Sequence, residues 1–296
     1  THLADQESTE LEQFRVKFSY EDKTRYDYWK RMEFTEEQWE GLYNHAREKG
    51  LDFLSSPFSI RALDMLDRIG IPAWKLGSGE VFNRSLIDRA IQTKKPIILS
   101  NGLSTYNEII EQTEYIKKYN GEVCVLSCVT AYPSQPEMIN IQDIGRLSEL
   151  LHCPIGISDH SATIYPSLSA VTLGATVLEV HVTMSTYMFG PDVRASVTIE
   201  QLREIVEGSL FITKMLRSNN SYDTRNSIRE SLKEMFSKSL YYNCNMTKGA
   251  IISDYDLIGK KPNVGLDSNK KEKIIGRVLN RDVAMGELVK MEHLEE

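Results

Sequence analysis

The chain has 296 residues, of which 41% are hydrophobic and 26% are charged, and its formal net charge at pH 7 is −7. This composition predicts a globular protein with one large domain, or with a large and a small domain. The negative charge argues against a nucleic-acid partner, and no apolar run approaches the roughly 20 residues that would cross a membrane. The amino end, residues 1–10, is polar and acidic, which is not the pattern of a secretory signal.

Residues 1–34 contain no clear helical or strand period, and we interpret them as a long loop. Residues 35–38 have the spacing of a capping box, which predicts a helix that ends near Lys49, before Gly50. Six β-rich runs follow, each with a helical stretch after it: 51–54, 73–76, 96–100, 122–128, 155–157 and 176–182. The last helix is expected from about Thr198 to Leu216.

This alternation of strands and helices predicts a parallel sheet with covering helices. Polar residues gather where the strands end, which is the catalytic face of a (β/α)₈ barrel. A doubly wound open sheet is the competing architecture, but no Gly-rich dinucleotide motif follows any strand. We therefore predict an α/β protein with a (β/α)₈ TIM barrel over residues 1–216. Because six units are not eight, we expect the chain to lack the first strand-helix-strand, about 50 residues at typical barrel sizes.

The segment after the barrel is polar and rich in turn residues, and we predict a linker over residues 217–236. Residues 237–296 form a second, β-rich domain in this interpretation. Within it, residues 246–257 parallel residues 283–294 without a gap, and Gly249 aligns with Gly286. A duplication of this kind predicts a small pseudo-symmetric β domain.

The four cysteines contain no C-x-x-C pair, so a structural zinc site is not expected. Cys124, Cys128 and Cys153 lie in or beside apolar runs, where a small buried side chain is the ordinary interpretation. Unpaired cysteines favour a reducing, cytoplasmic compartment.

His160 and His181 follow two neighbouring predicted strands, so their imidazoles would meet at one mouth of a barrel. Two imidazoles with open coordination positions suit a divalent metal that acts as a Lewis acid. A single histidine at a strand end is more often structural. Two on adjacent strands, one of them within Ser-Asp-His, favour a metal site.

A second group of strand-end residues has the chemistry of an anion site. The ammonium of Lys75 and the hydroxyls of neighbouring serines can bind phosphate and carboxylate oxygens. These serines are Ser56, Ser78, Ser100 and Ser158. Any one of them alone would be interpreted as a turn or helix cap, and their recurrence makes the anion site plausible.

Three further residues are candidates for contact with a substrate. Glu80 and Asp192 are placed to bind hydroxyl groups or to transfer a proton, although Asp192 follows Gly-Pro and could instead be a turn residue. Tyr132, before Pro133, is either a core aromatic or the wall of a pocket.

Taken together, these segments resemble the N-acetylneuraminate synthase family, which includes synthases for legionaminic and pseudaminic acids. The runs that carry the resemblance come in the family's order and cover nearly the whole chain. They are SSPF at 55–58, KLGSGE at 75–80, ILSNG at 98–102, CVTAYP at 128–133, GISDH at 156–160, EVHVT at 179–183 and GPD at 190–192. The tail resembles the family's antifreeze-like (SAF) domain.

The resemblance implies an enzyme that joins phosphoenolpyruvate to an N-acylated amino sugar. It implies a domain-swapped homodimer and a divalent metal, Mn²⁺ or else Mg²⁺ or Co²⁺, on His160 and His181. Phosphoenolpyruvate would be held by Lys75, Ser56, Ser78, Ser100, Thr130 and Ser158. The amino sugar would face Glu80, Tyr132 and Asp192, with Glu80 assisting a proton transfer.

The chain departs from the family's pattern at three places. The family's first two strands are not present, and Thr1-His2 matches what directly follows the second of them. Lys261 stands where the tail's sugar-contacting arginine is found, and Ser185 where an acidic residue often stands. The alternatives are another metal-dependent barrel enzyme of the aldolase type, or an inactive truncated scaffold.

Overall fold

The computed structural model describes residues 1–14, 21–119, 121–218 and 226–295. It divides the chain into two compact units, Thr1–Arg217 and Ser218–Glu296. Within the described residues, no helix combines the length and the apolar character needed to cross a bilayer.

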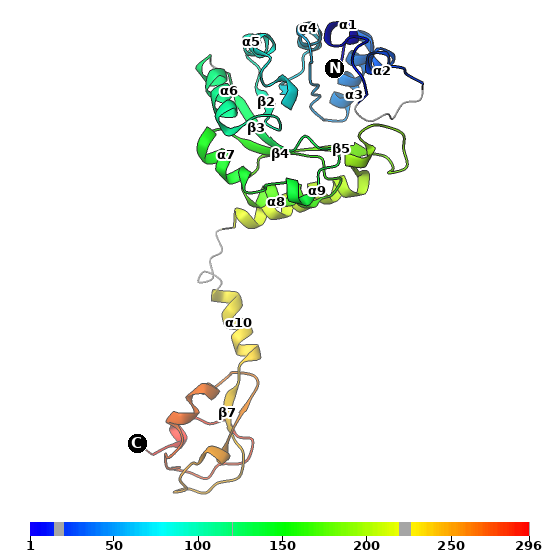
Figure 1. The fold of residues 1–296 in the computed structure, drawn as a ribbon. Helices are drawn as coiled ribbons and strands as arrows, with labels where there is room; N and C mark the ends of the chain where they lie inside the picture. The colour runs from blue at the N-terminus through cyan, green and yellow to red at the C-terminus, as the bar shows by residue number, and fades with distance from the viewer. Residues whose placement is uncertain (15–20, 120, 219–225, 296) are drawn as a thin grey trace. The chain divides into compact units, whose positions relative to one another are not determined.

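The first unit is built on a curved sheet whose strands lie in the order β1-β2-β3-β4-β5-β6, with every neighbouring pair parallel. The strands are β1 (Trp74–Leu76), β2 (Ile97–Ser100), β3 (Val123–Cys128), β4 (Ile155–Asp159), β5 (Val177–Thr183) and β6 (Ser196–Thr198). The curl of the sheet with helices on its outer side (Figure 1) makes a half-barrel, which confirms the predicted TIM-like class.

Three of the longer helices of this unit begin at capping boxes that are visible in the sequence. Thr35, Thr105 and Thr198 each form a capping box, in which the hydroxyl accepts a hydrogen bond from the third helical residue. The helices are α1 (Ala4–Glu7), α2 (Arg25–Met32), α3 (Glu36–Glu48), α4 (Ile60–Ile69), α5 (Arg84–Gln92), α6 (Tyr106–Lys118), α7 (Asp143–Leu151), α8 (Tyr165–Thr172) and α9 (Ile199–Leu216).

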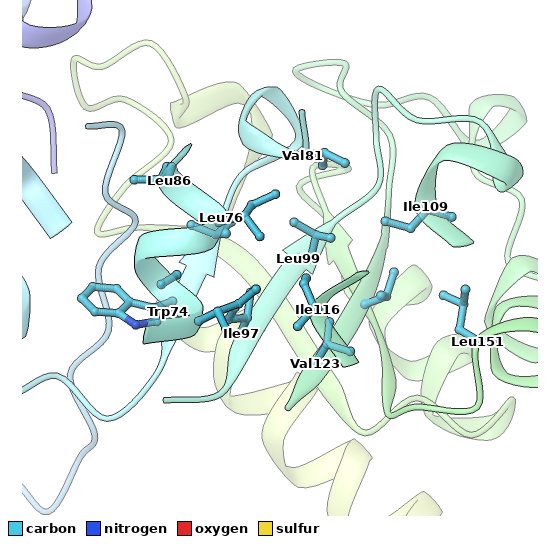
Figure 2. Close-up of a cluster of buried hydrophobic side chains, with 14 of the residues drawn as sticks. Trp74, Leu76, Val81, Leu86, Ile97, Leu99, Ile109, Ile116, Val123 and Leu151 are labelled. Carbon is cyan, nitrogen blue, oxygen red and sulfur yellow. The ribbon is translucent and has the colours of Figure 1, made fainter. Parts of the chain in front are cut away.

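The core of the first unit lies between the sheet and the helices. Alternate residues of each strand enter it, such as Trp74 and Leu76 of β1 and Ile97 and Leu99 of β2 (Figure 2). Removing one such side chain typically costs about 2–5 kcal/mol, so the face that each strand turns to the helices is strongly fixed. The intervening residues therefore face the inside of the curl.

Two sequence-based expectations for this unit are wrong. Residues 51–54 join no ladder, and the sixth strand is instead β6, which is too short to show a pattern. Helix α2 lies within the predicted loop. Its eight residues show little apolar periodicity, because polar contacts stabilise the helix. These contacts include a capping box at Thr24 and an Arg31–Asp22 ion pair with 2.6 Å between Nη2 and Oδ2.

The second unit contains helix α10 (Asn226–Phe236) and the antiparallel strands β7 (Ser239–Tyr242) and β8 (Leu257–Lys260). Helix α10 occupies the second half of the segment that we expected as a linker, and residues 219–225 of that segment lie outside the described residues. A small core surrounds Leu240 and Tyr242.

The internal repeat produces equivalent turns in this unit. Gly249 and Gly286 both have left-handed backbone conformations, with φ of 81° and 84°, which explains why glycine occurs at both positions. The two copies pair where they begin, through reciprocal hydrogen bonds of 3.0 and 2.9 Å between Met246 and Val283. Pseudo-symmetry is therefore present, while the assignment as an antifreeze-like domain stays a prediction.

Candidate active site

A cavity of about 290 Å³ lies at the carboxyl ends of the strands. Eight residues singled out from the sequence line it: Ser56, Lys75, Ser78, Ser100, Tyr132, Ser158, His160 and His181. The alternation described above brings them together. Lys75 lies between Trp74 and Leu76, and Ser100 follows Leu99, so the packing of their neighbours against the helices turns both toward the inside of the curl.

One half of the cavity contains the ammonium group of Lys75. Nζ of Lys75 donates hydrogen bonds to Oγ of Ser100 at 2.9 Å and to the carbonyl oxygen of Leu76 at 3.3 Å. It also lies 3.6 Å from Oε1 of Glu179, which accepts a 2.6 Å hydrogen bond from Oγ of Ser158. The side chain of Lys75 is 12% exposed, so its charge is held mostly out of water beside one carboxylate.

Glu179 was not among the candidate residues. Its signal is visible in the sequence, because it stands two positions before His181 in β5 and must therefore share that residue's face of the sheet. Both side chains line the cavity.

A pocket of hydroxyls borders the cavity at Gly102. The backbone N–H of Gly102 donates a 3.0 Å hydrogen bond to Oγ of Ser78. A Cβ at this position would collide with Oγ1 of Thr130 and lie 2.8 Å from Oγ of Ser78. Oγ1 of Thr130 is buried and has no hydrogen-bond partner in the described part of the chain. A buried hydroxyl of this kind is expected to bind water or a ligand oxygen.

The other half of the cavity holds the two imidazoles, whose ring centroids are 5.2 Å apart. Nδ1 of His160 lies 2.8 Å from the carbonyl oxygen of Val129. A carbonyl can only accept, so Nδ1 carries the proton and the lone pair of His160 is on Nε2. This is the tautomer that an Nε2 metal ligand requires.

The surroundings of His181 also favour the neutral form of its imidazole. Burial lowers its pKa below the ordinary value, and the neighbouring His160 and Lys75 act in the same direction. The carboxylates of Asp192 and Glu179 oppose that shift. The lone pair that coordinates a metal is therefore present at neutral pH.

The chemistry of these groups fits an open metal site. Within the described residues, no group of three or more His, Cys, Asp or Glu side chains gathers closely enough to hold a metal. Two imidazoles would leave the remaining coordination positions to substrate oxygens and water, so a metal bound there could act as a Lewis acid.

The remaining candidates lie around the cavity or apart from it. Glu80 does not line it, and its Oε2 accepts a 2.7 Å hydrogen bond from Nδ2 of Asn83. Asp192 is exposed, yet its charge acts on His181. Lys261 belongs to the second unit, where its Nζ lies 5.2 Å from the ring centroid of Phe236.

A second cavity of about 370 Å³ adjoins the first and shares Cys128, Ser158 and Asp159 with it. It contains neither imidazole and not Lys75. Burial raises the pKa of Asp159, whose carboxylate accepts hydrogen bonds from the backbone and hydroxyl of Ser161 at 2.9 and 3.0 Å. This contact stabilises the turn that follows His160. All four cysteines are free thiols.

Comparisons with a family profile, with curated proteins and with solved structures all lead to the same family. The profile of the NeuB family matches residues 2–221. The N,N'-diacetyllegionaminic acid synthase of Legionella pneumophila is 28% identical over 93% of this chain and 78% of its own length. The pseudaminic acid synthase of Helicobacter pylori is 30% identical over 80% of this chain and 69% of its own. The crystal structure of N-acetylneuraminic acid synthetase from Leptospira borgpetersenii, in complex with citrate, superposes with a TM-score of 0.63 at 30% identity, over 68% of this chain and 72% of that one.

Proposed function

Because the chain belongs to the NeuB family, we propose that it is a transferase that condenses phosphoenolpyruvate with an N-acylated amino sugar. The acceptor is N-acetylmannosamine or a diacetamido-dideoxy hexose, and the products are a nine-carbon 2-keto acid and phosphate. The observation that carries this proposal is the meeting of Lys75, the strand-end hydroxyls and two imidazoles in one cavity.

Phosphoenolpyruvate brings a carboxylate and a phosphate, and the Lys75 half of the cavity supplies complementary groups. The ammonium donates to Ser100 and to the carbonyl oxygen of Leu76, and its third N–H can donate to a substrate oxygen. Four hydroxyls line the same cavity, those of Ser56, Ser78, Ser100 and Ser158, and Oγ1 of Thr130 lies beside Gly102. Thr130 is the strongest individual candidate, because its buried Oγ1 is unsatisfied within the described residues.

His160 and His181 are the ligands for a divalent metal, Mn²⁺ or else Mg²⁺ or Co²⁺. When bound there, the metal supplies a Lewis acid for the aldehyde oxygen of the open-chain sugar. Burial keeps His181 neutral and the Val129 carbonyl keeps Nε2 of His160 open, so the chain prepares both lone pairs in advance.

In the reaction, carbon 3 of phosphoenolpyruvate forms a bond to the aldehyde carbon of the sugar. Water adds to carbon 2, and the bond from carbon 2 to the phosphate oxygen breaks to release phosphate. The hydroxyl cluster and Lys75 orient phosphoenolpyruvate, which removes the entropy cost of aligning two reactants. Glu80 transfers a proton, and Tyr132 and Asp192 contact the sugar. We propose Lys261 as a further sugar contact, and a domain-swapped homodimer as the assembly.

The proposal is tested by phosphate release from phosphoenolpyruvate with Mn²⁺ and a panel of N-acyl hexosamines. The chain is assayed beside a form extended at its amino end by the strand-helix-strand that the family resemblance predicts. Sugar-dependent release by either form supports the synthase and identifies the acceptor. Two folded, metal-loaded forms that release no phosphate with any sugar would overturn it.

A further inference from the structure

The segment after β3 contacts His160 at three points. The carbonyl oxygen of Val129 accepts from Nδ1 at 2.8 Å. The backbone N–H of Ser134 donates a 3.0 Å hydrogen bond to the carbonyl oxygen of His160. Between these two contacts, the ring of Tyr132 stacks on the imidazole with 4.2 Å between centroids and 30° between planes. Residues 129–134 therefore contact the backbone, the Nδ1 atom and the ring face of His160.

The same tyrosine ring contacts the second imidazole. Its centroid lies 5.7 Å from that of His181, with the planes at 73°. Tyr132 is 48% exposed, so its place against two histidines is not explained by burial in the hydrophobic core. The sequence left a core aromatic and a pocket wall as alternatives, and the exposure excludes the first.

We infer that Tyr132 is a positioning residue that fixes the plane of the His160 imidazole, and with it the direction of the Nε2 lone pair. This inference rests on the proposed function, because it assumes a metal on His160 and His181. The hydrogen bond to Val129 sets the tautomer and restrains one edge of the ring, while the χ2 torsion of a histidine is otherwise broad. The stacked ring narrows that torsion, since any large rotation would separate the two ring faces.

The stacking depends on the aromatic face and not on the phenolic oxygen. A phenylalanine at position 132 would preserve it, whereas a leucine would fill similar space without a flat surface. Groups that orient a metal-binding histidine typically contribute 10- to 100-fold in metal affinity.

The test measures Mn²⁺ affinity in the absence of any sugar, from the electron paramagnetic resonance signal of free Mn²⁺. Tyr132→Leu should weaken binding by about 10-fold or more, and Tyr132→Phe should bind within about 3-fold of the unsubstituted chain. Tyr119→Leu is the matched control, because Tyr119 is 47% exposed at the C-terminal end of α6 and packs against Tyr115. Circular dichroism verifies that each variant is folded.

The possible results separate this inference from the proposed function. If the unsubstituted chain and Tyr132→Leu bind Mn²⁺ equally well, the positioning role is wrong and the metal site stands. If the unsubstituted chain binds no Mn²⁺, the metal site and the inference fail together. Equal weakening in Tyr132→Phe and Tyr132→Leu would assign the effect to the hydroxyl and overturn the stacking argument.

Discussion

Lys75 of β1 and Glu179 of β5 approach each other across the cavity, with 3.6 Å between Nζ and Oε1. The two strands are not neighbours in the sheet, because β2, β3 and β4 lie between them. The contact therefore depends on the curl of the sheet, which brings their inner faces together. It also provides the largely buried ammonium with a counter-charge.

Lys75→Met should weaken the binding of phosphoenolpyruvate by about 30-fold or more. The variant removes the ammonium that would contact the anion, a loss of about 2–5 kcal/mol for a buried charge pair. Glu179 would then repel the anion without compensation. Isothermal titration with phosphoenolpyruvate measures the effect. Lys75→Arg keeps the charge and should lose less affinity for phosphoenolpyruvate. Equal losses of affinity in both variants would show that the charge of Lys75 does not bind the anion.

Gly102→Ala should reduce phosphoenolpyruvate affinity by at least about 10-fold, which corresponds to about 1.4 kcal/mol. The added methyl would collide with Oγ1 of Thr130 and press on Oγ of Ser78, so the hydroxyls that we assign to the anion would move. Gly145→Ala in α7 is the control, since a Cβ there has no atom within 4 Å. A Gly102→Ala variant with unchanged affinity would exclude this pocket from the substrate site.

Glu80→Gln should lower the rate of phosphate release at saturating substrates by about 10²- to 10⁴-fold, the usual contribution of a general acid or base. The amide keeps an oxygen that can accept from Nδ2 of Asn83, so the local geometry is preserved and phosphoenolpyruvate affinity should not change. Glu149→Gln, on the exposed surface of α7, should have full activity. Nearly full turnover of Glu80→Gln would remove its proposed role.

The second unit should become less stable as the pH falls below about 6.5. Burial lowers the pKa of His293 below its ordinary value, and Arg281 acts in the same direction while Glu287 and Glu292 oppose it. The unfolded chain then binds a proton at a higher pH than the folded unit does. The contribution of neutral His293 to the free energy of unfolding is complete above about pH 6.5. It is lost as the pH falls toward the folded pKa, by at most about 1.4 kcal/mol per pH unit.

Amide hydrogen exchange of Leu240 and Tyr242 between pH 5 and 7, expressed as protection factors, measures this loss. Both residues lie in the core of the second unit. His293 contacts this core through Tyr242, with 3.4 Å between Oη of Tyr242 and Nδ1 of His293. His293→Gln should flatten the pH dependence, whereas His45→Gln on the exposed surface of α3 should retain it. An unchanged slope in His293→Gln would contradict the prediction.

The sequence by itself determined the class of fold and most of the cavity's lining. Strand residues such as Trp74 and Leu76 alternate with Lys75, and this two-residue period decides which side chain faces the helices before any tertiary contact is known. Helix starts at Thr35 and Thr198 are equally local, because a capping box lies within four residues. The order of motifs along the chain also sufficed to identify the family, which the match over residues 2–221 confirms.

Only the tertiary structure decided which of these groups touch. Glu179 beside Lys75, Gly102 against Thr130 and Tyr132 on His160 are contacts between different strands or loops. The first depends on the curl of the sheet, and the other two on the pairing of neighbouring strands, rather than on any local period. The short strand β6 likewise exists because β5 offers it a partner, and its three residues show no pattern of their own. A local period fixes the face of a side chain, whereas the distance between two faces is set by the packing of the whole unit.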